Sequence, residues 1–93
     1  MVNAEKFYKK LIDRLSEEVR EALSEQDKAF HRETEVVKLL YDKTMPYEDY
    51  IKLQKELETL QQIQNNACFT KDVFVHAREI VFDLYDEMKK KEE

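Results

Sequence analysis

The chain has 93 residues, of which 42% are hydrophobic and 40% charged, and its formal net charge is −5. It contains no glycine and one proline, Pro46. Because these two residue types interrupt and redirect regular structure, their near absence argues against a β-rich or α/β domain and predicts an all-α fold. Five tyrosines and five phenylalanines argue against a disordered chain, and the acidic balance argues against direct binding to DNA or RNA.

A single domain spanning residues 1–93 is expected, because a chain of this length forms one hydrophobic core. Cys68 is the only cysteine, which excludes a disulfide within the chain and a zinc site built from cysteines. No apolar run approaches the roughly 20 residues that cross a bilayer, and none near the N-terminus resembles a signal peptide. We therefore expect a soluble, cytoplasmic protein that makes no contact with a membrane.

The first predicted helix begins near Asn3, a good N-cap residue, with Val2 and Phe7 at the two positions of a hydrophobic staple. Apolar residues recur at helical spacing, become sparse between residues 24 and 35, and then resume. One interpretation is a continuous helix from about residue 4 to about residue 42. The other is a break near Ser24, which would cap a second helix. No glycine or proline marks a break, and this favours the continuous helix.

A corner is predicted at residues 43–46, where Thr44 can cap the next helix and Pro46 fits its first turn. The helix that follows carries a seam of residues in alternating steps of three and four, the spacing of a heptad repeat. The positions of this seam are Tyr50, Leu53, Leu57, Leu60, Gln64 and Ala67.

A second corner is predicted at Phe69 and Thr70, because Thr70 is a suitable N-cap and Phe69 and Phe74 occupy the two staple positions. The last predicted helix covers residues 71–90. One face of this helix holds Val73, Ala77, Ile80, Val81, Leu84 and Met88, and further apolar residues widen that face. We therefore expect this helix at the centre of the core, covered on more than one side.

These elements predict a long N-terminal helix followed by a helical hairpin. The hairpin would be roughly 30 Å long, about half the length of the first helix. A three-helix chain of this shape leaves part of the long helix uncovered, so we expect it to form a homodimer through that helix. A break near Ser24 would instead produce a monomeric four-helix bundle.

Acidic residues form the first candidate binding surface. Asp13, Glu17, Glu21 and Glu25 are spaced by four along the first helix, and Glu79, Asp83 and Glu87 repeat this spacing near the C-terminus. Like charges at this spacing weaken a helix slightly. The first stripe is either a solvated outer face or a surface for a basic partner, on which carboxylates would imitate the phosphates of a nucleic acid.

Two tyrosines near the first corner, Tyr47 and Tyr50, are candidate interface residues, because tyrosine is enriched at protein interfaces. For chemistry the sequence offers little. His76 and Glu79 occur once in the His-x-x-Glu order, and Cys68 has no evident partner, so we expect no catalytic residue, metal site or cofactor.

The sequence therefore predicts a small acidic helical protein that binds another protein, as an adaptor, an inhibitor or a regulatory subunit. Two further hypotheses remain open at this point. One is a nucleic-acid mimic that blocks a DNA- or RNA-binding protein through its acidic stripe. The other is a small helical enzyme or metal protein.

Overall fold

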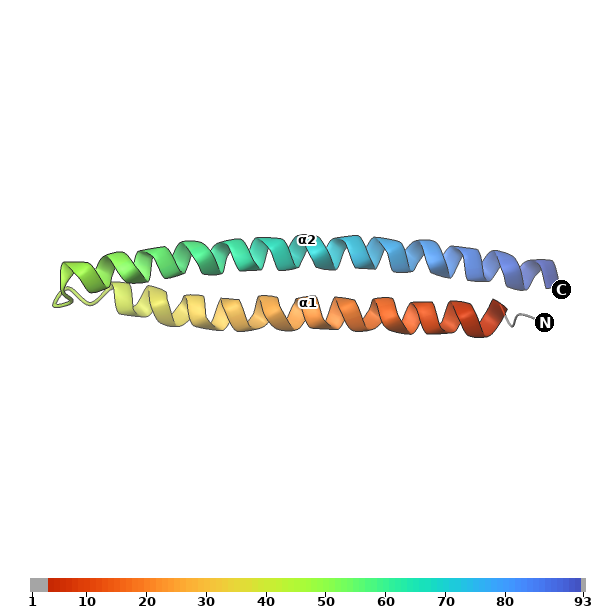
Figure 1. Cartoon of the computed structure of the whole chain (residues 1–93), viewed down its shortest axis with the longest axis horizontal. Helices are drawn as coiled ribbons and strands as arrows, with labels where there is room; N and C mark the ends of the chain where they lie inside the picture. Colours follow the sequence, from red (N-terminus) through yellow and green to blue (C-terminus); the bar gives the residue numbers. More distant parts are fainter. Residues whose placement is uncertain (1–3, 93) are drawn as a thin grey trace.

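The computed structural model describes residues 4–92, which form two α-helices joined by a short loop (Figure 1). Helix α1 spans Ala4–Leu40 and helix α2 spans Tyr47–Glu92. The two helices lie antiparallel and side by side, so that the molecule is a rod measuring 71 × 16 × 14 Å. The 46 residues of α2 alone account for about 69 Å of this length. The all-α prediction is confirmed for the described residues.

Helix α1 is uninterrupted, which confirms the continuous helix across residues 24–35. This stretch is poor in apolar residues, but it contains good helix formers and no glycine or proline. Ala29 is buried in its middle, and Gln26 and Glu33 are half-buried beside it. The stretch therefore packs against α2 like the rest of the helix. The predicted N-cap Asn3 and the staple residue Val2 lie outside the described residues.

The predicted second corner is wrong, because α2 continues through Phe69 and Thr70 without a break. Both side chains are exposed on the surface of the helix, so Thr70 caps nothing and Phe69 forms no staple. The predicted helical hairpin after the first helix is therefore one long helix. Neither the three-helix chain nor the four-helix bundle forms within a single chain, and the fold is a two-helix hairpin.

A continuous heptad repeat on each helix holds the hairpin together, and we call these paired positions the inner seam. On α1 it consists of Tyr8, Ile12, Leu15, Val19, Ala22, Gln26, Ala29, Glu33, Val36 and Leu40. On α2 it consists of Tyr50, Leu53, Leu57, Leu60, Gln64, Ala67, Lys71, Phe74, Arg78, Val81, Tyr85 and Met88. Every one of these residues is buried or half-buried. The steps of three and four keep one side of each helix facing the other along the whole rod.

The seam also explains why the predicted second corner does not form. The repeat from Tyr50 to Ala67 continues in the same register through Lys71, Phe74 and Arg78. Long basic side chains can place their methylene groups along an apolar surface while their charged ends reach water. Arg78 is half-buried at the seam, and its Nη1 donates to Ser16 Oγ at 3.2 Å. The helix can therefore keep Phe74 half-buried in the seam without changing direction.

The middle of the seam is thinly packed. Among the described residues only Val36 is fully buried, and three of the six buried hydrophobic residues are alanines: Ala22, Ala29 and Ala67. Close to them, Gln64 Nε2 donates a hydrogen bond to the Glu33 carboxylate across the two helices. This polar pair belongs to the seam and fixes the register in which α1 meets α2.

Polar contacts join the helices on either side of this middle region. Toward the loop, Arg32 makes two hydrogen bonds to the Glu56 carboxylate, at 2.5 and 3.1 Å, and these bonds lower the pKa of Glu56. Toward the termini, the Tyr85 hydroxyl donates to Glu5 Oε1 at 3.0 Å and is the main cause of a lowered Glu5 pKa. Lys89 Nζ lies 4.8 Å from the centre of the Tyr85 ring.

The loop confirms the predicted corner at residues 43–46, although Thr44 does not cap α2. Thr44 donates through its backbone N–H and its hydroxyl to Asp42 Oδ1, at 2.9 and 2.7 Å. These two bonds close the turn and lower the pKa of Asp42. Helix α2 begins three residues later, and its first turn is closed by the Tyr50 N–H donating to the Pro46 carbonyl at 3.1 Å.

Candidate functional site

The hairpin exposes much more surface than a compact protein of its mass. Its solvent-accessible surface is 7603 Å². A compact monomer of 11.3 kDa is expected to expose roughly 5,700 Å². The difference of about 1,900 Å² arises because each helix has only one neighbour. Among the described residues thirteen large hydrophobic side chains are exposed, and seven of them belong to two rows on opposite sides of the inner seam.

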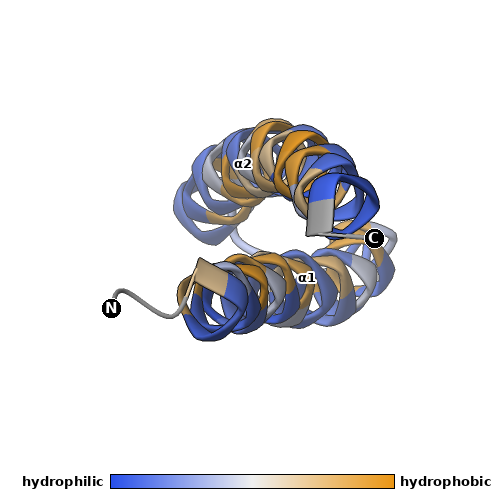
Figure 2. Ribbon diagram, turned by 90° about the vertical axis from the view of Figure 1, so that its right-hand side faces the viewer, coloured by the Kyte–Doolittle hydropathy of each residue, from blue (hydrophilic) through white to orange (hydrophobic). Residues whose placement is uncertain are grey.

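The first row runs along α2, and we call it the outer row. It consists of Ile63, Asn66, Thr70, Val73, Ala77, Ile80 and Leu84, again in steps of three and four. It lies roughly a quarter turn around the helix from the inner seam. Its four large hydrophobic side chains, Ile63, Val73, Ile80 and Leu84, are all exposed. Figure 2 shows the same feature as orange on the outer side of α2 as well as between the helices.

The outer row corrects the predicted face of the last helix. The predicted face divides between two surfaces: Val81 and Met88 belong to the inner seam, whereas Val73, Ile80 and Leu84 point away from α1. The prediction that this segment is covered on more than one side is not met within one chain. The helix has two apolar sides, and α1 covers one of them.

The second row runs along α1, and we call it the flank row. It consists of Leu23, Phe30 and Val37, which lie seven residues apart and are all exposed. A spacing of seven returns to the same side of a helix after two turns, so the three side chains form a single line about 21 Å long. This line borders the inner seam on the side opposite to the outer row.

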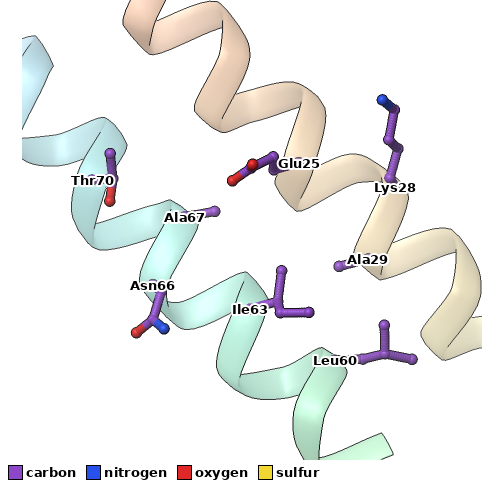
Figure 3. A pocket seen from close by; sticks show the side chains of 8 residues that line it. All are labelled: Glu25, Lys28, Ala29, Leu60, Ile63, Asn66, Ala67 and Thr70. Atoms are coloured by element: carbon purple, nitrogen blue, oxygen red, sulfur yellow. The ribbon is translucent and has the colours of Figure 1, made fainter. Parts of the chain in front are cut away.

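Two shallow surface depressions establish which residues share a side. One is lined by Ala29 and Ala67, with Glu25, Lys28 and the outer-row residues Ile63, Asn66 and Thr70 around them (Figure 3). The small alanine side chains leave this groove between the helices. The other depression is lined by the flank-row residues Leu23 and Phe30 together with Gln26, Asp27 and Gln64. The two rows therefore open onto different sides of the rod.

The four residues of the predicted acidic stripe, Asp13, Glu17, Glu21 and Glu25, are all exposed. Within the described part of the chain none of them forms an ion pair. Each step of four residues advances about 40° around the helix, so the stripe winds through roughly a third of a turn. Of the four, Glu25 lines the depression beside the outer row. Asp13 lies two heptads before Asp27, which lines the depression beside the flank row, so Asp13 is on that side. The stripe is therefore not a flat acidic face.

The two predicted tyrosines lie near the loop and have different surroundings. Tyr47 starts α2 and is 75% exposed. Tyr50 belongs to the inner seam, and its hydroxyl accepts a hydrogen bond from Gln54 Nε2 at 2.9 Å. The distance along α1 from Glu25 to Leu40, which is next to the loop, is about 22 Å. The structure therefore does not bring the tyrosines and the acidic stripe into one site.

The residues considered for chemistry are dispersed. Cys68 is half-buried within α2 rather than at a helix end, and His76 is exposed on the same helix. His31 Nδ1 lies 4.0 Å from Asp27 Oδ1 on the exposed side of α1. Among residues 4–91 no group of three or more His, Cys, Asp or Glu side chains is placed to hold a metal ion. In the described helices no apolar stretch is long enough to cross a membrane.

Sequence reasoning missed both apolar rows as distinct surfaces. The seven-residue interval between Leu23, Phe30 and Val37 was a usable signal for the flank row. The outer row could be separated from the inner seam only once the seam was followed past Ala67. Comparisons with protein-family models, with curated proteins and with solved structures found no match to this chain.

Proposed function

We propose that this protein acts by binding another protein, as an adaptor, an inhibitor or a regulatory subunit, and that the flank row is its binding surface. The observation that carries the proposal is the single line of Leu23, Phe30 and Val37, exposed on a hairpin that has nothing to cover it. Isolated apolar residues are normal on a protein surface, whereas an aligned group of large ones is typical of an interaction site.

The surroundings of the flank row match the anatomy of a protein interface. A depression lies between Leu23 and Phe30, and Gln26, Asp27 and Gln64 also line it. Asp27 lines this depression, and Arg20 and Thr34 precede and follow it at seven-residue intervals on the same edge of α1. A hydrophobic centre with a polar rim is the usual composition of a specific interface. A partner helix lying along the groove would meet all three apolar side chains.

The proposal is tested by capturing partners from host lysate with the tagged protein, with quantitative mass spectrometry as the measurement. We expect one partner at a constant ratio to the bait, retained at high salt because apolar contacts are not screened. Phe30→Glu should reduce its recovery at least tenfold. Leu39→Glu, at an exposed position on the opposite side of α1, is the matched control and should leave recovery unchanged. Equal recovery with both variants would contradict the proposal.

The nucleic-acid mimic is the competing hypothesis, and it makes the opposite prediction for salt. Its support is that Asp13, Glu17 and Glu21 are exposed and lack ion-pair partners in the described region. A partner held by these carboxylates would be lost as salt rises. Replacing Glu17 and Glu21 together by lysine would abolish its capture, whereas Phe30→Glu would have no effect.

A further inference from the structure

We propose that the outer row of α2 binds a second copy of this chain, with the two α2 helices antiparallel, to form a four-helix bundle. This inference uses the side of the rod opposite to the flank row and does not depend on the proposed function. It also differs from the dimer expected from the sequence, which was to form through the first helix. That expectation required a hairpin half as long as α1, whereas α2 runs beside the whole of α1.

The spacing of the outer row indicates a helix as its occupant. Steps of three and four are the spacing with which α2 packs on α1, and the outer row repeats them from Ile63 to Leu84. A helix with two such seams has two helical neighbours, as in a four-helix bundle. In the described part of one chain the only other helix is α1, which already occupies the inner seam. The second neighbour must therefore come from another molecule.

The available area is sufficient for a dimer. The chain exposes about 1,900 Å² more than a compact protein of its mass, and a standard interface buries about 800 Å² on each partner. The apolar part of the outer row, from Val73 to Leu84, is continued on the same side of the rod by Phe7 and Leu11 of α1. Phe7 is among the most exposed phenylalanines of the chain. Burial of this patch is the driving force for pairing.

Charge decides between the two symmetric ways of pairing two hairpins. If α2 lay on α1 of the second copy, the outer row would face the side of α1 that carries Glu18, Glu21 and Glu25, three carboxylates. If α2 lies on α2 of the second copy, apolar side chains meet apolar side chains. The second arrangement keeps these carboxylates away from the outer row, where their burial would be costly. It makes both new contacts, α2 with α2 and α1 with α1, antiparallel.

The α1 side of this arrangement contains one complementary pair of charges. Arg78 contacts Ser16, so the centre of the apolar row, at Ala77 and Ile80, lies beside the segment of α1 around Arg14. Arg14 lies two heptads before Lys28, and Glu18 lies one heptad before Glu25. Because Lys28 and Glu25 line the groove around Ala29 and Ala67, Arg14 and Glu18 lie on that same side of α1. Neither has an ion-pair partner in the described part of the chain. A two-fold axis at this level brings Arg14 of each copy toward Glu18 of the other.

The test is the mass of the purified protein in solution, measured by analytical ultracentrifugation at several concentrations. We expect the wild-type chain to sediment at twice its mass of 11.3 kDa. Ile80→Glu should raise the dimer Kd at least tenfold. Phe82→Glu is the matched control, because Phe82 is 43% exposed and Ile80 49%, on opposite sides of the same helix. Circular dichroism confirms that both variants remain helical, and Leu84→Glu replaces Ile80→Glu if the latter unfolds.

Orientation and charge pairing are tested separately. Nitroxide labels at position 90, in a Lys90→Cys, Cys68→Ser chain, should lie more than about 30 Å apart in an antiparallel dimer and much closer in a parallel one. Arg14→Glu should weaken the dimer, and Arg14→Glu with Glu18→Arg should restore it. A monomeric wild-type protein would overturn the inference, as would a dimer broken by Phe82→Glu and not by Ile80→Glu. Capture through the flank row would be unaffected by these results, so the two proposals fail independently.

Discussion

The two helices of the rod distribute their apolar residues differently. Helix α1 concentrates them on the inner seam, adds the flank row, and exposes Phe7 and Leu39 singly on the opposite side. Helix α2 has an inner seam and, over its C-terminal half, a second seam of the same spacing on another side. Helix α1 therefore has one continuous apolar seam for a helical neighbour, whereas α2 has two. The hairpin satisfies the first requirement and leaves the second open.

The largest expected loss of stability comes from a charge placed in the inner seam of α1. Val36 is fully buried, and its neighbour Val37 is exposed in the flank row. We expect Val36→Asp to lower the free energy of unfolding by about 3 kcal/mol or more, because it buries a carboxylate without a partner. Val37→Asp should change it by less than about 0.5 kcal/mol. Urea denaturation followed by circular dichroism measures both, and similar losses would mean that the two sides of α1 do not differ as described.

The second prediction concerns the thinly packed middle of the inner seam, where a change of intermediate size in stability is expected. Replacing Glu33 and Gln64 together by leucine removes the polar pair that crosses the helices and fills the space with apolar atoms. We expect the free energy of unfolding to rise by about 1–2 kcal/mol, since a half-buried polar pair contributes less than apolar packing of similar volume. Glu33→Leu alone should lower it, because Gln64 then loses its acceptor. A thermal melt of the three proteins checks this order.

The smallest expected effect concerns pH and the contact between Arg32 and Glu56. The Arg32 hydrogen bonds lower the pKa of Glu56 in the folded protein, and the arginine does not titrate in this range. The contact therefore stabilises the fold above the ordinary pKa of a glutamate and is lost as pH falls through the lower folded pKa. We expect wild type to be slightly more stable than Glu56→Gln at neutral pH, and this difference to vanish in acid.

This pH dependence distinguishes the ion pair from the rest of the molecule. Because the chain has 21 acidic residues, each variant is compared with wild type at the same pH rather than with itself at another pH. Glu58→Gln, two residues further along α2, is the control because Glu58 is exposed and has no ion pair in the described region. A difference between wild type and Glu56→Gln that persists in strong acid would exclude the carboxylate as its source.

Most of the local structure could be predicted from the residues. The absence of glycine predicted helices, residues 43–46 predicted the corner, and the spacing from Tyr50 to Ala67 predicted part of the inner seam. These features are local, because a helix satisfies its backbone hydrogen bonds within a few residues and needs no distant partner to choose its conformation. The error at Thr70 was also local: a threonine between two phenylalanines imitates a helix start, although nothing there ends the preceding helix.

The candidate site was less predictable than the fold. The acidic stripe and the two tyrosines were identified by residue type, and their function stays a prediction. The flank row and the outer row depend on which side of each helix is covered. Residues 71–90 contain two apolar stripes, and their composition alone favours the wrong one, because Lys71 and Arg78 occupy the correct seam.

The amino-acid sequence was enough to establish that the chain is helical and that a loop lies at residues 43–46, since both depend on neighbours along the chain. The pairing of the helices required the folded hairpin. It placed Gln64 against Glu33 and Arg78 against Ser16, contacts between residues 31 and 62 positions apart. Once that register is set, Val81 becomes buried and Ile80 becomes exposed, although both are apolar and adjacent. Burial depends on the position of a distant helix, and for this reason the exposed rows emerged from the fold and not from the pattern of residues.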